Sequence, residues 1–239
     1  MNNLSSIFDI KKGDVVSIVG SGGKTTLMFK LADELKDTYK VLVTTSTKIY
    51  MPDKKYKIYT TLENFINNHD EIENGIIVVA GGYNAESNKL IGINDDDSDI
   101  LMKHFDIILI EADGSRGLPL KGWKEHEPVI LKASDKTIGI ITANTINKRI
   151  DSDFVYNYDE FNILTDYSDR LDFEAVQKIC TRKNGLFKNS DGYVYLFLNQ
   201  ADTEEDVKNS RELSTYLKQY DCNFKICVGS LKKEEYYEC

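Results

Sequence analysis

Apolar residues along the chain fall into short continuous runs that alternate with stretches of helical spacing. The first run, residues 15–19, is followed by helical spacing over 25–36 and by a second apolar run over 40–44. Continuous apolar runs of this length predict buried strands, so the chain opens with a strand, a helix and a strand. The further predicted strands are 76–80, 106–110, 136–142, 193–198 and 224–228, and the further predicted helices are 62–68, 98–104, 173–181 and 203–219.

Strands and helices that alternate in this way predict an α/β fold, in which a mostly parallel sheet carries helices on both faces. The chain has 239 residues, 41% of them hydrophobic, which is enough to bury one sizeable core. We therefore expect a single domain over residues 1–239. Two segments with little apolar periodicity, near 81–94 and 113–128, are expected to be inserted loops, and the glycines of the first also fit a small hairpin.

The junction between the first strand and the first helix carries the sequence GSGGKTT at residues 20–26. Glycine has no Cβ, so the backbone can turn tightly here and point successive N–H groups into one concavity, where the helix N-terminus adds positive potential. Lys24 is suited to the β- and γ-phosphates of a nucleoside triphosphate, and the Thr25 hydroxyl is suited to Mg²⁺. This predicts a P-loop NTPase-like fold that binds Mg²⁺ and either ATP or GTP. The residues expected to hold the triphosphate are Gly20, Ser21, Gly22, Gly23, Lys24, Thr25 and Thr26.

The spacing of this loop departs from the usual G-x-x-x-x-G-K-[ST], because the residue six before Lys24 is Ile18. The result is a shortened G-x-x-G-K-T loop, similar to the short loops of Mur ligases and folylpolyglutamate synthetases. The alternative interpretation is a glycine-rich turn with a surface lysine. In both interpretations we expect the Lys24 side chain to be exposed.

Two carboxylates follow the apolar run at 107–110. Glu111 and Asp113 share one face at the end of this predicted strand, and in a P-loop fold that strand end faces Thr25 across the Mg²⁺ site. One carboxylate would bind the metal through water and the other would orient a nucleophile, and the sequence leaves open which does which. The alternative is a pair of exposed carboxylates after a strand.

The segment that follows is rich in charge. Arg116, Lys121 and Lys124 are suited to stabilising phosphoryl charge or gripping an anionic substrate, and His126 is suited to general acid or base chemistry. The alternative is a surface loop pinned by Trp123, in which neighbouring glutamates neutralise the lysines.

A run of hydroxyl residues at 44–47 ends in Lys48, directly after the second predicted strand. This places it at the same edge of the sheet as the glycine loop. Lys48 and the hydroxyls are suited to the γ-phosphate, to Mg²⁺ or to a second substrate. The alternative is a threonine-rich strand end that satisfies its own turn.

The last predicted motif is NQAD at residues 199–202, which resembles the N-K-x-D element that reads the base in GTP-binding proteins. A carboxylate at Asp202 accepts from the N1–H and N2–H₂ edge of guanine but meets an acceptor at N1 of adenine, so Asn199 and Asp202 favour GTP. Gln200 stands where that element usually has lysine. The alternative is a helix cap formed by Asp202 or Thr203.

Charge and composition narrow the partners. The formal net charge of −9 gives no reason to expect binding to nucleic acid or to an anionic membrane. No leading stretch resembles a signal peptide and no apolar run approaches the length of a bilayer span, so we expect a cytoplasmic protein. Cys180, Cys222, Cys227 and Cys239 are expected to be reduced thiols, with 180 and 227 buried and Cys239 exposed and able to react. His69 and His104 are expected to be structural, and residues 95–97 are expected to be an acidic helix start.

Taken together, the motifs resemble those of the YqeC family of selenium-dependent hydroxylase accessory proteins. The resemblance runs from residue 13 to about 202 through GSGGKTT, VTTSTKI, VVAGG, EADGSRGLPLKGWKEHEP, GLFK and FLNQAD. It implies a P-loop nucleotide-binding protein that acts in the maturation of selenium-dependent molybdenum hydroxylases, at the molybdenum–pterin cofactor. The chain departs from the family at Leu131, a position that often holds proline.

Three functions are compatible with these features. The first is an Mg²⁺-dependent NTPase or phosphotransferase that acts in preparing or inserting the selenium-containing molybdenum cofactor. The second is a nucleotide-dependent switch or escort protein that hands the cofactor to an apo-hydroxylase with little hydrolysis. The third, a Mur-like ligase, ranks last because the chain lacks room for the additional domains of that family. The candidate catalytic residues are Lys24, Lys48, Glu111, Asp113, Arg116 and His126.

Overall fold

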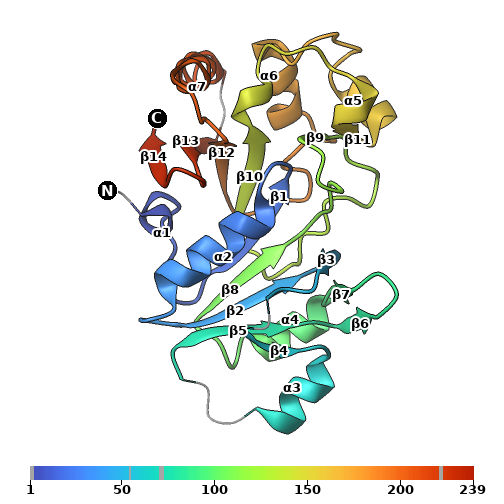
Figure 1. The fold of residues 1–239 in the computed structure, drawn as a ribbon, viewed down its shortest axis with the longest axis vertical. Coiled ribbons are helices and arrows are strands. Elements are labelled where there is room, and N and C mark those ends of the chain that lie inside the picture. The colour runs from blue at the N-terminus through green and yellow to red at the C-terminus, as the bar shows by residue number, and fades with distance from the viewer. Residues whose placement is uncertain (1–2, 54, 70–72, 221–222) are drawn as a thin grey trace.

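A nine-stranded sheet runs through the whole molecule (Figure 1). The computed structural model describes residues 3–53, 55–69, 73–220 and 223–239. Every neighbouring pair of strands in this sheet is parallel except β13 and β14, which confirms the mostly parallel α/β fold. In spatial order the strands are β14 (Glu235–Glu238), β13 (Phe224–Ser230), β12 (Tyr193–Asn199), β10 (Lys136–Thr142), β1 (Val15–Gly20), β8 (Ile107–Glu111), β2 (Lys40–Thr45), β5 (Gly75–Val79) and β4 (Lys57–Tyr59).

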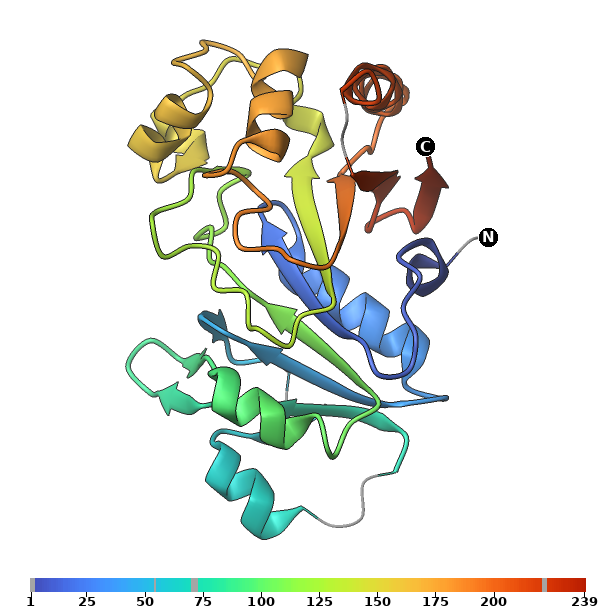
Figure 2. The ribbon, with the colours of Figure 1, turned by 180° about the vertical axis from the view of Figure 1, so that it is seen from behind.

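Helices cover both faces of the sheet (Figures 1 and 2). The helices are α1 (Leu4–Ile7), α2 (Lys24–Leu35), α3 (Leu62–Asn68), α4 (Asp95–Leu101), α5 (Tyr158–Leu164), α6 (Phe173–Thr181) and α7 (Glu204–Leu217). Successive residues of β1 point to opposite faces, so Val16 packs in a core with α1 and α2. Val15 packs with α3 and α4, and Val19 packs with α5, α6 and α7. Burial on both faces explains why the central strands are continuously apolar.

Residues 81–94, the segment expected to be a loop or hairpin, form part of a second, smaller sheet. Strands β6 (Gly82–Asn84) and β7 (Lys89–Ile91) form an antiparallel hairpin, and β3 (Lys48–Tyr50) pairs with β7 to complete three strands. The hairpin alternative for residues 81–94 is thus confirmed. The segment at 113–128 is largely irregular, as expected, with β9 (Leu120–Lys121) pairing with β11 (Val155–Tyr156).

Some predicted boundaries were wrong. The helix expected over 98–104 begins three residues earlier, because the Asn94 side chain accepts from the Asp97 backbone N–H and forms a capping box with it. The acidic residues 95–97 lie in the first turn of that helix, as expected for a helix start. The short elements α1, β3, β4, β9, β11 and β14, and the helix α5, were not predicted.

The described cysteines at 180 and 227 are buried, and the two histidines pack against neighbouring rings, as expected. Burial raises the pKa of Cys227 to about 12. Cys222 lies outside the described residues. His69 stacks on Phe65 with 4.5 Å between ring centroids, and burial lowers the pKa of the neighbouring His104. Across the described ranges, none of the helices is both long enough and apolar enough to cross a membrane.

Candidate phosphate-binding cleft

A cleft of about 840 Å³ opens at the carboxyl ends of β1, β8 and β2. In the strand order, β8 and β2 lie to one side of β1, and β10 lies to the other. The chain passes from β1 through α2 to β2, so the direction in which strands are added changes at β1. Crevices at such points are the usual ligand sites of open α/β sheets. The predicted site residues that line the cleft are Gly22, Gly23, Lys24, Thr25, Thr26, Lys48, Glu111, Arg116 and His126. Those that the structure places outside its lining are Gly20, Ser21, Asp113, Asn199 and Asp202.

The glycine loop has a backbone that other residues would strain. Gly20, Gly22 and Gly23 have φ of 98°, 87° and 121°, in the left-handed region that favours glycine. A Cβ on Gly22 would lie 2.0 Å from Thr142 Oγ1, so the loop is also closely packed. Because Gly23 precedes α2, no side chain caps this helix, and the backbone N–H groups of residues 22–26 have no acceptor among the described residues. Five such donors beside a helix N-terminus are the arrangement that anion-binding sites at helix N-termini use.

Lys24 is buried, which corrects the expectation that it is exposed. Its side chain lies under the loop, and only 5% of the residue is exposed. The ammonium group donates to the Gly20 carbonyl at 2.6 Å and lies 3.3 Å from Asp113 Oδ1 and 4.0 Å from Glu111 Oε1. The Lys24 ammonium therefore lies at the base of the cleft, where it pairs with two carboxylates.

The Asp113 carboxylate is fully buried beneath the loop, and the structure gives it a positioning role. Both of its oxygens accept from the Gly20 backbone N–H, at 3.1 and 3.0 Å, and Oδ2 also accepts from Trp123 Nε1 at 2.8 Å. Lys121 Nζ lies 3.5 Å away on the other side. With these partners Asp113 fixes the start of the glycine loop and does not line the cleft.

Glu111 faces the cleft, beside Thr25. The Thr25 hydroxyl donates to Glu111 Oε2 at 2.6 Å, and the Glu111 residue is 7% exposed. Burial raises the pKa of Glu111, while Lys24 and the Thr25 hydroxyl act in the opposite direction. Mg²⁺ in nucleotide sites is held by one or two carboxylates, by hydroxyl groups and by substrate phosphates. Thr25 and Glu111 supply such a donor pair, so the residues present fit Mg²⁺.

The basic segment divides into residues that reach the cleft and residues that do not. Arg116 lines the cleft, and its guanidinium lies 5.1 Å from the ring centroid of Tyr156. His126 is exposed on the same wall. Lys121 is buried, donates to the Gly114 carbonyl at 2.6 Å and pairs with Glu127 at 3.1 Å, so it supports the loop from within. Lys124 is exposed and outside the cleft lining.

The threonine-rich segment after β2 is partly structural and partly open to the cleft. The Thr44 hydroxyl donates to the Val79 carbonyl, and the Thr45 hydroxyl donates to the Glu111 carbonyl, as in the self-satisfied turn considered above. Thr47 and Lys48 line the cleft instead. The cleft lining also includes residues that the sequence did not single out, among them Tyr50, Lys89 and Tyr156.

Asn199 and Asp202 lie on the other side of the loop. The Asn199 amide donates to the Gly22 carbonyl at 2.6 Å and accepts from the Leu231 backbone N–H at 3.1 Å, so its side chain holds the loop. Asp202 Oδ1 accepts from the Ser230 hydroxyl at 2.5 Å. The helix cap of α7 is Thr203, whose side chain accepts from the Asp206 backbone N–H. Asp202 lines a separate hollow of about 470 Å³ that Lys233 also lines.

Comparison with known proteins agrees with these motifs. The family described as YqeC protein matches residues 16–159, a segment that contains the glycine loop, Glu111 and both walls of the cleft. A protein of Escherichia coli (strain K12), described as "Uncharacterized protein YqeC", is 31% identical over 230 residues, which cover 93% of this chain and 90% of that protein. This chain therefore belongs to the YqeC protein family.

Proposed function

We propose that the protein binds a Mg²⁺–nucleoside triphosphate in the cleft and hydrolyses it or transfers its γ-phosphoryl group. The observation that carries this proposal is the set of unsatisfied N–H groups at residues 22–26, with Lys24 beneath them and the Thr25–Glu111 pair beside them. These are the donors, the cation and the metal ligands that phosphoryl transfer requires.

Each group has a defined task in this proposal. The N–H groups of the loop bind phosphate oxygens, and Lys24 leaves the Gly20 carbonyl to reach the β- and γ-phosphates. Asp113 and Trp123 keep the loop in place while the Lys24 ammonium moves. Thr25 and Glu111 would hold Mg²⁺, which neutralises charge on the phosphate oxygens when bound. His126, on the opposite wall, is placed to accept a proton from the attacking group.

The identity of the base is part of the proposal. Thr203 caps α7, so the Asp202 carboxylate is not needed for that purpose. Asp202 Oδ1 accepts from Ser230, which leaves its second oxygen available to the N1–H and N2–H₂ groups of guanine. Asn199 joins this strand end to the Gly22 carbonyl and so fixes its position relative to the phosphate loop. On this assignment of Asp202 the protein prefers GTP to ATP.

The biological role follows from the family resemblance. We place this nucleotide chemistry in the maturation of the selenium-containing molybdenum cofactor of selenium-dependent hydroxylases. A second candidate is a nucleotide-dependent escort that delivers the cofactor with little hydrolysis, which the Asn199 and Asp202 contacts support because GTP-binding switches read the base. Partner binding that is identical in the nucleotide-free, diphosphate and triphosphate states would argue against the escort.

The first experiment is calorimetric titration of the protein with ATP and with GTP, with and without Mg²⁺. In Lys24→Ala we expect the affinity for the triphosphate to fall by more than about tenfold, because a charge-assisted hydrogen bond contributes about 1.5–3 kcal/mol. Asp113 keeps Gly20, Trp123 and Lys121 as partners, so the variant should remain folded. A GTP preference in the wild type would support Asp202 as the base-reading residue.

Lys36→Ala is the matched control, because Lys36 lies at the far end of α2 and pairs with Asp33 at the surface. It should bind the triphosphate like the wild type. Equal affinities in Lys24→Ala and Lys36→Ala would remove the basis of the proposed function.

A further inference from the structure

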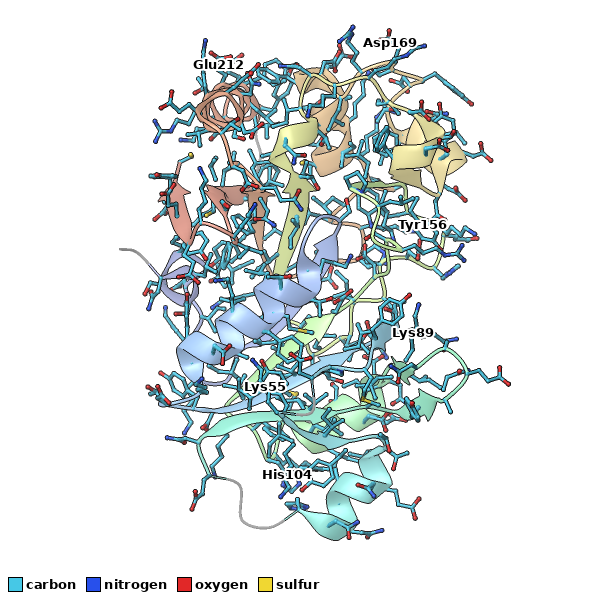
Figure 3. All side chains as sticks on the ribbon, in the orientation of Figure 1. Lys55, Lys89, His104, Tyr156, Asp169 and Glu212 are labelled. Carbon is cyan, nitrogen blue, oxygen red and sulfur yellow. The ribbon has the colours of Figure 1, made fainter. Side chains whose placement is uncertain are left out.

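Two pairs of a cation and an aromatic ring line the cleft on segments other than the phosphate loop, and we call this part of the lining its outer end. Lys89 Nζ lies 4.4 Å from the ring centroid of Tyr50 on the small sheet. The Arg116 guanidinium lies 5.1 Å from the ring centroid of Tyr156. Figure 3 labels Lys89 and Tyr156 on different segments on the same side of the molecule, and all four residues line the cleft.

The charge at this end of the cleft is positive and unbalanced. Among the described residues, no carboxylate lies within ion-pair distance of Lys48, Lys89 or Arg116. The acidic residues of the lining are already engaged. Glu111 accepts from Thr25, and Glu127 pairs with Lys121 at 3.1 Å. A part of the cleft whose cations have no carboxylate partner attracts an anionic ligand.

Arg116 has an unfavourable backbone conformation, and this conformation directs its side chain toward the cleft. Arg116 has φ of 50°, a left-handed conformation that is unfavourable for a residue with a Cβ. Gly117 follows it with φ of 79°, where glycine carries no such cost. The strained residue is the one whose guanidinium reaches the ring of Tyr156 and the cleft, and strain of this kind concentrates at functional sites.

The rings also hold the two cations in advance of binding. A cation over an aromatic face is attracted to the ring, and it gives up part of its side-chain freedom before a ligand arrives. Preordered donors bind an anion with a smaller entropy loss than free lysine and arginine side chains do.

We propose that this outer end of the cleft binds the second substrate, and that this substrate is a small organic anion with a carboxylate or phosphate group held between Lys89 and Arg116. The proposal rests on the proposed function, since it supplies the acceptor for a nucleotide held at residues 22–26. Lys48 and His126 lie on the same cleft lining and add to the positive charge around the acceptor.

The test uses citrate and inorganic phosphate as probes. The full chain is saturated with Mg²⁺ and a non-hydrolysable triphosphate analogue, and each probe is titrated by calorimetry. We expect a probe to bind while the analogue stays bound, and we expect Lys89→Ala and Arg116→Ala each to weaken that binding by about tenfold. Tighter binding of citrate would identify a carboxylate ligand, and tighter binding of phosphate would identify a phosphorylated one.

The matched control is Lys55→Ala. Lys55 lies 4.8 Å from the ring centroid of Tyr56, so this variant removes a cation–aromatic pair of the same kind outside the cleft. It should bind both probes like the wild type. The proposal is overturned if neither probe binds, if the probes displace the analogue, or if all three variants behave alike. Citrate titration of nucleotide-free Lys24→Ala separates the two proposals, because it probes the outer anion site when the phosphate loop is disabled.

Discussion

Glu111 and Asp113 are two residues apart and carry the same charge, yet their surroundings assign them different tasks. Asp113 is surrounded by donors from the loop, from Trp123 and from Lys121, and it has no opening to the cleft. Glu111 has one neutral donor, the Thr25 hydroxyl, and an open side. A buried carboxylate with many donors is a structural anchor, whereas one with few donors is available to a metal or a proton.

This difference predicts a pH dependence. Burial raises the pKa of Glu111, so the carboxyl is more costly to ionise in the folded protein than in the unfolded chain. Its contribution to stability is therefore lost as the pH rises from its ordinary pKa through the raised value. In Glu111→Gln this loss should disappear, so the variant should have a higher Tm than the wild type at neutral and alkaline pH, with a difference that shrinks toward acid pH.

Thermal unfolding across a pH series measures that difference. The same variant should lose more than about tenfold in affinity for the Mg²⁺–triphosphate, because a carboxylate ligand is absent. Parallel Tm curves for the two proteins at all pH values would show that Glu111 ionises as readily in the folded protein as in the unfolded chain.

At the scale of elements, the junction of β1 and α2 combines two separate constraints. A positive φ excludes most residues at Gly22, and the Thr142 hydroxyl leaves no space for a Cβ. In Gly22→Ala we expect a loss of about 1–3 kcal/mol in the free energy of unfolding from the close contact, together with loss of triphosphate binding as the loop shifts. Denaturant unfolding and calorimetry measure the two effects.

Gly13→Ala separates strain from packing. Gly13 has φ of 97° but no atom within 4 Å of an added Cβ, so this variant carries only the backbone cost of about 1–2 kcal/mol. It should bind the triphosphate normally. Normal binding in Gly22→Ala as well would mean that the N–H cradle at residues 22–26 does not require this loop geometry.

Local sequence signals account for the central strands, the loop and the strand-end carboxylates, because each depends on residues close together in the chain. The buried strands β1, β2, β8 and β10 are continuous apolar runs that need no partner to be recognised. The edge strand β14, with the sequence EYYE, has no such pattern and exists through its pairing with β13. Tertiary pairing of short polar strands cannot be read from local periodicity.

The same distinction applies to the site. Lys89 and Tyr50 reach the cleft only because β3 pairs with β7, with Tyr50 opposite Lys89 in the register. Tyr156 reaches it through the pairing of β11 with β9. The burial of Lys24 was not predicted either, because it depends on Asp113, which comes from a strand far along the chain.

At the scale of the whole molecule, the fluorescence of one buried tryptophan can report on the phosphate loop. Trp123 is the only tryptophan of the chain, is 6% exposed and donates to the carboxylate that holds Gly20. Binding of a Mg²⁺–triphosphate should change its fluorescence, because Lys24 moves away from Asp113 as it engages the phosphates.

A fluorescence titration with ATP and GTP should give the same dissociation constants as calorimetry. Lys24→Ala should show no spectral change over the same concentration range. A spectrum that is unchanged at saturating nucleotide would mean that nucleotide binding does not alter the contacts of Asp113 and Trp123.

The ion pairs beneath the phosphate loop affect the stability of the protein when no nucleotide is bound. Lys24 has the Gly20 carbonyl and two carboxylates as partners, so the buried positive charge of the cleft is already paired within the chain. The fold does not depend on a nucleotide to neutralise a buried charge. We therefore expect the empty protein to stay folded and to withstand limited proteolysis, and nucleotide to add only the stability that binding itself supplies.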